Sequence, residues 1–258
     1  MKIIFEIYYH TRWGESLFLS GDIDELGANE ENRAVMMDYQ GDGLWKYTME
    51  LPASAKKFHY EYLVKSGEGI RREWGSPHSF SPGRNAGKYR LVDRWRDVPA
   101  NLPFYSSAFI QGIFFRQHAD SVVETIEQGT FTVKVDAPQL RPDERLVMVG
   151  DCPELGDWDV LKAPLLNDSA FPEWQITLDG RQLKFPFEYK FVIVRTHQRE
   201  VVAWETGENR ICREKPQNPS EAVVVSGLRF NGSESQWRGA GTAIPVFSLR
   251  TDYGFGIG

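Results

Sequence analysis

The sequence predicts an all-β protein made of two tandem antiparallel β-sandwiches. The chain repeats itself, because a shift of 129 residues places Trp45 on Trp174 and Tyr60 on Tyr189. Apolar and polar residues alternate along short segments separated by Gly, Pro, Asn and Asp, which is the pattern of half-buried strands. No stretch of 12 residues shows the period of 3.6 that an amphipathic helix requires. Together these observations indicate sandwiches of the broad immunoglobulin-like type.

The repeat divides the chain into two copies of one module, at residues 1–95 and 128–232. Residues 96–127 form the linker between them. Its segment from Phe109 to Phe115 is too apolar for a solvated linker, so we expect it to pack between the modules and to fix their orientation.

The strands expected in the first copy are Ile3–Tyr9, Ser16–Ser20, Trp45–Glu50 and the alternating run Phe58, Tyr60, Tyr62 and Val64. Those expected in the second copy are Thr130–Asp136, Arg145–Val149, Trp174–Leu178, the alternating run Phe185, Phe187, Tyr189, Phe191 and Ile193, and Ala222–Val225. All are short, as the strands of a sandwich are.

Composition excludes several classes of protein. Hydrophobic residues make up 41% and charged residues 26%, which is typical of a globular chain that can bury a core. The formal net charge of −6 argues against a nucleic-acid or anionic-membrane surface, so the expected partner is uncharged. No apolar run approaches the ~18 residues of a membrane-spanning helix, and no leader pattern opens the chain. We therefore expect a cytoplasmic protein.

Signatures of catalysis are absent. The five histidines do not stand at metal-ligand spacing, and neither a nucleophile elbow nor a phosphate-binding loop is present. Acidic pairs are abundant, but spacing alone cannot place two carboxylates across a cleft. We expect no catalytic residue, no metal and no cofactor in these residues.

The informative residues are aromatic and lie outside apolar runs. Trp158 follows Gly156 and Asp157 in an expected loop, and Trp204 ends a short strand beside another loop. An indole ring suits the C–H face of a pyranose, while the sugar hydroxyls need partners such as Lys190 and Asn209. The alternative is that both tryptophans merely cap the sandwich.

The second copy resembles the starch-binding modules of carbohydrate-binding module family 20. The resemblance is carried by Leu155-Gly156-Asp157-Trp158, then Phe187-Glu188-Tyr189-Lys190-Phe191, then Trp204-Glu205 and Asn209-Arg210, and it covers nearly all of residues 128–215. It implies that Trp158, Trp204, Lys190 and Asn209 hold α-1,4-glucan, and that Trp174 is a core residue.

The first copy departs from this pattern. Asn29 stands in the place of Trp158, Glu61 in that of Lys190 and Ser79 in that of Asn209, so that only Trp74 remains.

A second resemblance lies earlier in the same copy. Residues 11–16, Thr-Arg-Trp-Gly-Glu-Ser, are similar to the stretch that supplies the family's second glucan site. The resemblance implies that Trp13 is an aromatic contact, with Tyr39 as its partner. The alternatives are an ordinary aromatic at a strand end and a tyrosine in a turn.

Residues 233–258 lie outside both copies and are expected to begin a catalytic barrel that is cut short. Residues 241–258 resemble the start of the barrel in glycoside hydrolase family 77, the 4-α-glucanotransferases. The resemblance implies a retaining glucan transfer by a downstream domain in cis. Two alternatives remain: a non-catalytic glycogen-sensing or scaffold protein, and an adhesive sandwich that binds another protein.

Overall fold

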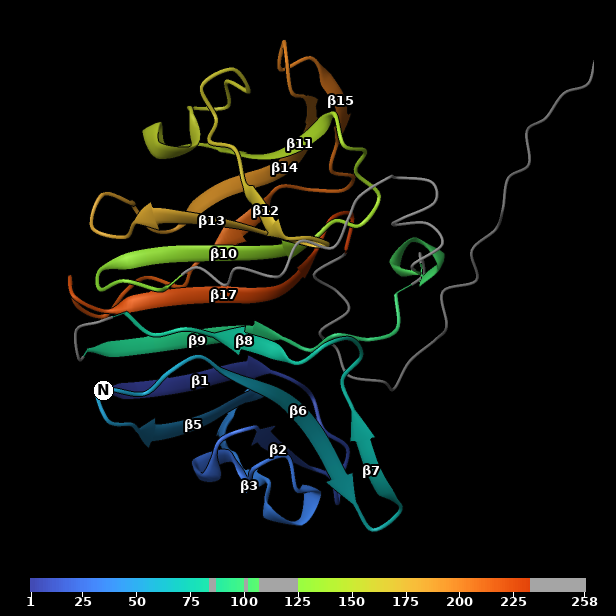
Figure 1. Cartoon of the computed structure of the whole chain (residues 1–258), viewed down its shortest axis with the longest axis vertical. Coiled ribbons are helices and arrows are strands. Elements are labelled where there is room, and N and C mark those ends of the chain that lie inside the picture. The colour runs from blue at the N-terminus through green and yellow to red at the C-terminus, as the bar shows by residue number, and fades with distance from the viewer. Residues whose placement is uncertain (84–86, 100–101, 107–124, 233–258) are drawn as a thin grey trace, which may run out of the picture.

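In the computed structural model, which describes residues 1–83, 87–99, 102–106 and 125–232, one sheet of eight strands runs through the whole molecule (Figure 1). Its strands, in spatial order, are β12 (Asn167–Ala170), β13 (Glu173–Asp179), β10 (Thr130–Asp136), β17 (Ala222–Arg229), β9 (Lys88–Arg94), β1 (Lys2–Tyr8), β5 (Leu44–Glu50) and β4 (Asp38–Gly41). The first half (residues 1–99) supplies β9, β1, β5 and β4, and the second half (residues 125–232) supplies the other four.

Each half adds a second sheet of its own. In the first half it consists of β3 (Val35–Met36), β2 (Ser16–Gly21), β6 (Phe58–Ser66) and β7 (Gly69–Arg72), with β8 (His78–Phe80) also paired to β6. In the second half it consists of β11 (Glu144–Gly150), β14 (Phe187–Arg195) and β15 (Val201–Trp204), with β16 (Arg210–Cys212) also paired to β14. Four 3-10 turns complete the described elements, at Asp24–Leu26, Glu31–Arg33, Leu102–Tyr105 and Pro153–Leu155. The all-β prediction is confirmed. The predicted strands lie within about two residues of observed ones, except that β17 continues past the predicted end at Val225 to Arg229.

Most strand pairs are antiparallel, but the first and last strands of each half run parallel. β1 pairs with β9 and β10 pairs with β17 in this way. The last strands of the two halves also pair in parallel, with Val224 opposite Leu91 and Val225 opposite Val92. This β9–β17 pair makes the two four-stranded layers continuous.

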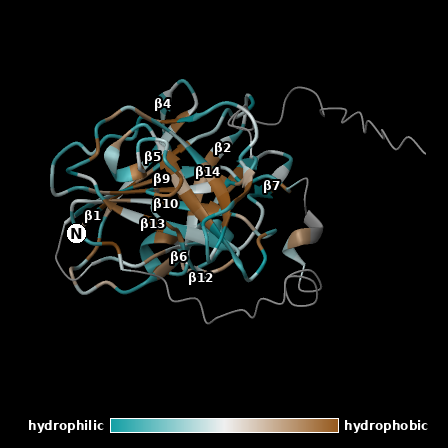
Figure 2. Cartoon of the chain, turned by 90° about the horizontal axis from the view of Figure 1, so that it is seen from above, coloured by the Kyte–Doolittle hydropathy of each residue, from teal (hydrophilic) through white to brown (hydrophobic). Residues whose placement is uncertain are grey.

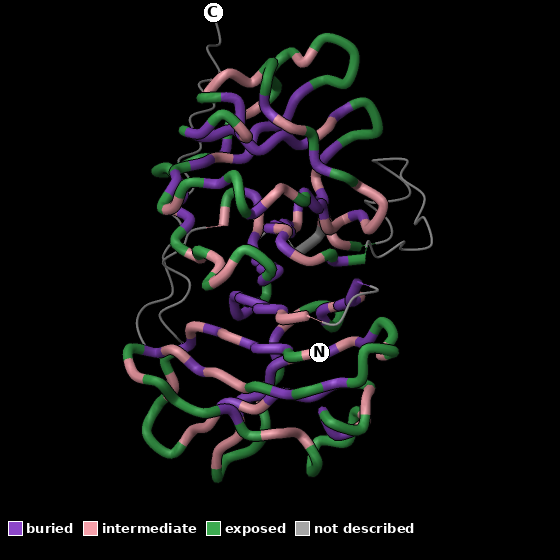
Figure 3. The backbone as a smooth tube through the Cα atoms, turned by 90° about the vertical axis from the view of Figure 1, so that its left-hand side faces the viewer, coloured by how far each residue is buried: buried purple, intermediate pink, exposed green. Residues whose placement is uncertain are grey.

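The two cores lie on opposite faces of the continuous sheet. Ala222 and Val224 of β17 pack into the core of the first half, whereas Val223 and Val225 pack into that of the second. β9 is buried on both faces in the same way, with Leu91 in the first core and Val92 in the second. Successive side chains of a strand alternate between faces, so each half borrows one face of its neighbour's last strand. Figures 2 and 3 show the apolar, buried strands inside and the polar, exposed loops outside.

A buried carboxylate fastens the junction. Asp93 of β9 is fully buried and accepts hydrogen bonds from the hydroxyls of Tyr60 (2.9 Å) and Tyr62 (2.6 Å) in the first half. It also accepts one from Ser226 of the second half at 2.5 Å. Because a buried carboxylate must be hydrogen-bonded, these three donors make the Asp93 site depend on both halves.

Two expectations fall on residues that are not described. The packing of residues 109–115 between the halves and the barrel start at 233–258 both lie outside the described residues. The β9–β17 pairing fixes the orientation of the halves within the described part. Trp174 is fully buried and its indole donates to the Ala137 carbonyl at 3.1 Å, as expected of a core tryptophan.

Candidate functional site

Trp158 lies in a loop whose backbone is held in an unusual conformation. After the turn Pro153–Leu155, three successive residues have positive φ: Gly156 (82°), Asp157 (49°) and Trp158 (64°). The left-handed region is unfavourable for a bulky residue, so other bonds must hold it. One is the Trp158 amide, which donates to the Gly150 carbonyl at 2.7 Å.

A layer of small aliphatic side chains supports the Trp158 indole. Trp158 packs against a buried cluster on the outer face of the β11–β14 sheet, made of Val147, Val149, Ala163, Val192 and Val194. The outer face of a sandwich sheet is usually polar. The valines here provide an apolar surface against which the aromatic ring packs.

Trp204 lies on this same face. In the antiparallel pair of β14 and β15, Trp204 stands directly opposite Val192. Opposite residues project from the same side of a sheet, so Trp204 shares the face that Trp158 covers. Its side chain is 43% exposed, which leaves an indole surface open to solvent. The structure therefore brings the two predicted tryptophans onto one surface.

Lys190 and Asn209 are at the same surface and already have protein partners. Tyr189 and Phe191 lie in the core, so Lys190 projects from the outer face between them. Its ammonium donates to the carbonyls of Glu205 (3.1 Å) and Gly207 (2.5 Å), which leaves one of its three hydrogens for another acceptor. The Asn209 amide donates to a Glu188 carboxylate oxygen at 2.9 Å.

A buried ion pair closes the loop that carries Trp204 and Asn209. Glu205, directly after Trp204, accepts from Arg210, directly after Asn209, through Nε (2.9 Å) and Nη2 (2.5 Å). Arg210 also donates to the Arg229 carbonyl at 2.8 Å. Both side chains of the pair are almost fully buried, so the loop ends are held firmly.

Sequence reasoning did not single out this pair, although the motifs Trp204-Glu205 and Asn209-Arg210 contained both residues. Beside the loop is a hollow of about 290 Å³, lined by residues 205–210, Asn231 and Gly232.

The first half lacks such a surface at the equivalent place. Trp74, the counterpart of Trp204, is covered by the Tyr105 ring, with centroids 4.9 Å apart, and by the Arg229 guanidinium at 5.4 Å. Glu61, the counterpart of Lys190, is ion-paired to Arg72. Of the four site residues, the first copy keeps only the tryptophan, and its covering by Tyr105 and Arg229 was not expected from the sequence.

Trp13 occupies a turn and is fully exposed (103%). The Glu15 amide donates to the Arg12 carbonyl at 3.0 Å, and Gly14 has φ of 83°, so Trp13 occupies the second position of a type II-like turn. The Glu15 carboxylate accepts from the Arg12 amide at 2.9 Å and fixes the turn. Within the described residues, the indole at this tip is therefore not part of the core.

Tyr39 lies on β4 at the same end of the first half. Its ring is 56% exposed and lies 5.1 Å from the buried ring of Trp45. The chain enters the Trp13 turn from Tyr9, whose amide donates to the Gly43 carbonyl at 2.7 Å. The amide of Gly43 in turn donates to the Tyr39 hydroxyl at 3.2 Å. Backbone hydrogen bonds of Gly43, in the β4–β5 connection, thus link Tyr39 to the segment that leads into the Trp13 turn.

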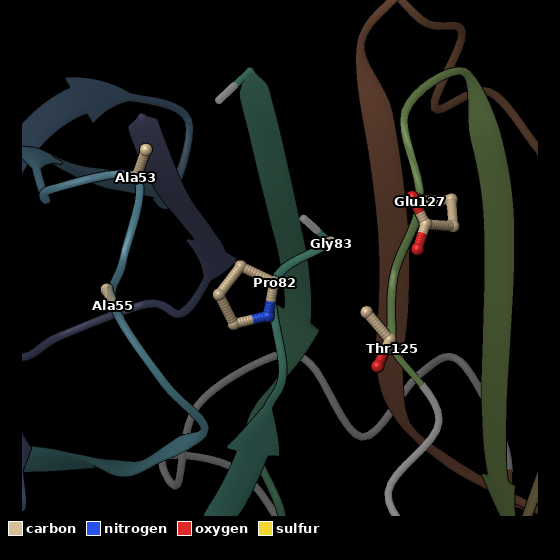
Figure 4. Close-up of a pocket in the computed structure, with 6 residues that line it drawn as sticks. All are labelled: Ala53, Ala55, Pro82, Gly83, Thr125 and Glu127. Atoms are coloured by element: carbon tan, nitrogen blue, oxygen red, sulfur yellow. The ribbon is translucent and has the colours of Figure 1, made fainter. Parts of the chain in front are cut away.

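A larger hollow lies between the halves. It measures about 670 Å³ and is lined by Ala53, Ala55, Pro82, Gly83, Thr125 and Glu127 (Figure 4). Its described walls carry no aromatic ring and a single charged group, so it does not resemble the predicted site. Among the described residues, no three His, Cys, Asp or Glu side chains are grouped so as to hold a metal ion. No helix of the described chain is long and apolar enough to cross a membrane.

Comparison with known proteins identifies the family of the chain. The family model for the starch binding domain matches residues 1–85 and 128–223. The chain is 28% identical over 284 residues to 4-alpha-glucanotransferase DPE2 of Oryza sativa subsp. japonica; the match covers 100% of this chain and 29% of the relative. It is 32% identical over 73 residues to the AA13 family lytic polysaccharide monooxygenase A of Aspergillus terreus, covering 27% of this chain and 18% of that protein. The chain thus spans less than a third of the length of these relatives.

Two solved structures have weak overall similarity. The family 20 carbohydrate-binding module of a maltotetraose-forming amylase from Pseudomonas saccharophila STB07 matches with 20% identity and a TM-score of 0.31, over 38% of this chain and 99% of that one. The family 15 glucoamylase of Hypocrea jecorina matches with 21% identity and a TM-score of 0.34, over 37% of this chain and 17% of the other.

Proposed function

This chain belongs to the starch binding domain family, and we propose that it binds α-1,4-glucan on the surface formed by Trp158 and Trp204. The observation that carries the proposal is their common face: both indoles lie on the valine-covered side of the β11–β14–β15 sheet. A glucan chain presents C–H faces that stack on aromatic rings and hydroxyls that need polar partners. The free hydrogen of the Lys190 ammonium and the carbonyl oxygen of the Asn209 amide supply a donor and an acceptor beside the rings.

Calorimetric titration with maltoheptaose and β-cyclodextrin tests this site. One small aromatic surface supports a Kd of about 10 µM to 1 mM. Trp204→Ala and Trp158→Ala should each weaken binding by about 1–3 kcal/mol, the range measured for bases stacked on aromatic side chains. Trp74→Phe is the matched control, since Trp74 is the covered counterpart and should not affect affinity. Unchanged affinity in Trp204→Ala would refute the assignment.

The proposal extends to the organisation of the chain. Residues 1–95 and 128–232 form a tandem pair of starch-binding modules, and Trp13 with Tyr39 provides a second glucan site in the first module. The family model matches each of these segments separately, which supports this division.

We further propose that the chain is the glucan-binding region of a 4-alpha-glucanotransferase, with catalysis in a downstream domain. The support is that the whole chain matches 29% of a rice relative that is named as a 4-alpha-glucanotransferase. An assay of maltose or maltotriose disproportionation tests it on the 258-residue chain and on a longer chain that continues past Gly258. Only the longer chain should release glucose. Glucose release by the shorter chain would contradict the division of labour, and an inactive longer chain would favour a glycogen-sensing role.

A further inference from the structure

Arg199 occupies a position that its turn does not explain. It lies in the hairpin between β14 and β15, where the Arg199 amide donates to the Arg195 carbonyl at 3.0 Å. Its φ is 50°, in the left-handed region where glycine is favoured and arginine is uncommon. The matching hairpin of the first half, between β6 and β7, has Gly69 with φ of 139°. An arginine at this position therefore points to a use for its side chain.

That side chain binds the loop that carries Trp158. The Nη1 atom of Arg199 donates to the carbonyls of Ala163 (2.7 Å) and Leu161 (2.8 Å), and a longer contact reaches that of Val160 (3.4 Å). The two short bonds use both hydrogens of this nitrogen, and their charged donor makes them stronger than neutral bonds. One guanidinium thus binds the carbonyls at the C-terminal end of the loop.

The near end of this loop is held separately, by the bond from the Trp158 amide to Gly150. Between the two attachments Trp158 and Val160 are half-buried against the valine cluster, and Leu161 is 66% exposed. Arg199 also lies two residues before β15, the strand that ends in Trp204. The same hairpin therefore presents one indole and holds the loop that presents the other.

We propose that Arg199 is a positioning residue that sets the spacing between the Trp158 and Trp204 rings. This inference rests on the proposed glucan-binding function. Arg199 does not touch the sugar; it fixes the loop against the valine layer before ligand arrives. Without it, ordering the loop would count against the free energy of binding.

Two variants separate positioning from a purely structural role. Arg199→Gly removes the side chain and relieves the positive φ, so the melting temperature should stay level or rise while affinity for maltoheptaose falls about 3- to 10-fold. Arg199→Lys keeps the charge, but the lysine side chain is one bond shorter and ends in a tetrahedral ammonium in place of the planar guanidinium. It should therefore lose a similar part of the affinity. Arg195→Ala, at the start of the same hairpin, is the control and should bind normally.

A double-mutant cycle assigns the effect to the loop. In the Trp158→Ala background Arg199→Gly should cause no further loss, because the ring that it positions is gone. Amide exchange without ligand should also accelerate at Lys162 and Ala163, whose amides bond to the Asp159 carbonyl, in Arg199→Gly but not in Arg195→Ala.

The outcomes distinguish this inference from the proposed function. Unchanged affinity in Arg199→Gly, with affinity lost in Trp204→Ala, overturns the role of Arg199 alone. An equal loss in the Trp158→Ala background also overturns it. Absence of binding by the natural chain overturns the glucan site itself.

Discussion

The shared sheet predicts that damage to one half destabilises the other. Val224 belongs to β17 of the second half, yet its buried side chain packs in the core of the first. Val224→Ala removes two methyl groups, worth about 1.6 kcal/mol at ~0.8 kcal/mol each, and the remaining cavity brings the loss to about 2–3 kcal/mol. For a unit of this size the melting temperature should fall by roughly 5–10 °C.

Thermal unfolding and amide exchange measure this effect. The chain should unfold in one transition, and protection should fall by the same free energy in β5 of the first half and β13 of the second. Val201→Ala, a change at a largely exposed valine, is the control and should shift neither. Two separate transitions, or a loss of protection confined to one half, would refute the reasoning.

Two further predictions concern pH and the first module. Burial tends to raise the pKa of Glu73, but the charges of His78 and Arg96 lower it to about 2, so its stabilising effect is lost as pH falls from about 5 to 2. Burial raises the pKa of Asp136 to about 6, so stability is gained as pH falls from about 7 to 4. Unfolding midpoints should therefore peak near pH 4–5. Glu73→Gln should remove the fall in stability below this peak, and Asp136→Asn should remove the fall above it; a flat profile in this range would contradict both assignments. Trp13→Ala should weaken retention on amylose more than binding of a short maltooligosaccharide, since a polymer can engage two sites, and should leave the melting temperature unchanged because the indole buries nothing. Full retention would make the first module structural only.

The strands were predictable because their chemistry is local. Alternation of Phe58, Tyr60 and Tyr62 with polar residues fixes which face of β6 is buried, and the core contains all three. Because the chain repeats, the same alternation predicts which face of β14 is buried. For the candidate site, strand alternation places Lys190 on the outer face, and the family resemblance groups Trp158, Trp204 and Asn209 with it.

The junction between the halves was not predictable in this way. The run from Ala222 to Val225 indicates a strand buried on both faces, but does not say which strand lies beside it. Pairing with β9 depends on a strand that lies far away in the sequence, since Val224 pairs with Leu91. For the same reason Trp74 matches Trp204 in the sequence alignment of the two copies, while its covering by Arg229 comes from the opposite half.

The roles of the long cationic side chains were also hidden. Lys190 and Arg199 both donate to backbone carbonyls. Because every residue has such a carbonyl, the sequence does not identify which one is the acceptor. Which carbonyls face inward is decided by positive-φ turns such as the one at Trp158, which only the folded loop displays.

The β9–β17 pair also determines which strand edges are open to self-association. An unpaired strand edge is a template for aggregation. The free edges of the eight-stranded sheet are β4 and β12, each four residues long and each paired to its neighbour with an irregular register. Separating the halves would instead expose β9 and β17, seven and eight residues long and buried on both faces. If the two halves were produced separately, each would carry an open strand edge, which in the intact protein is paired with the other half.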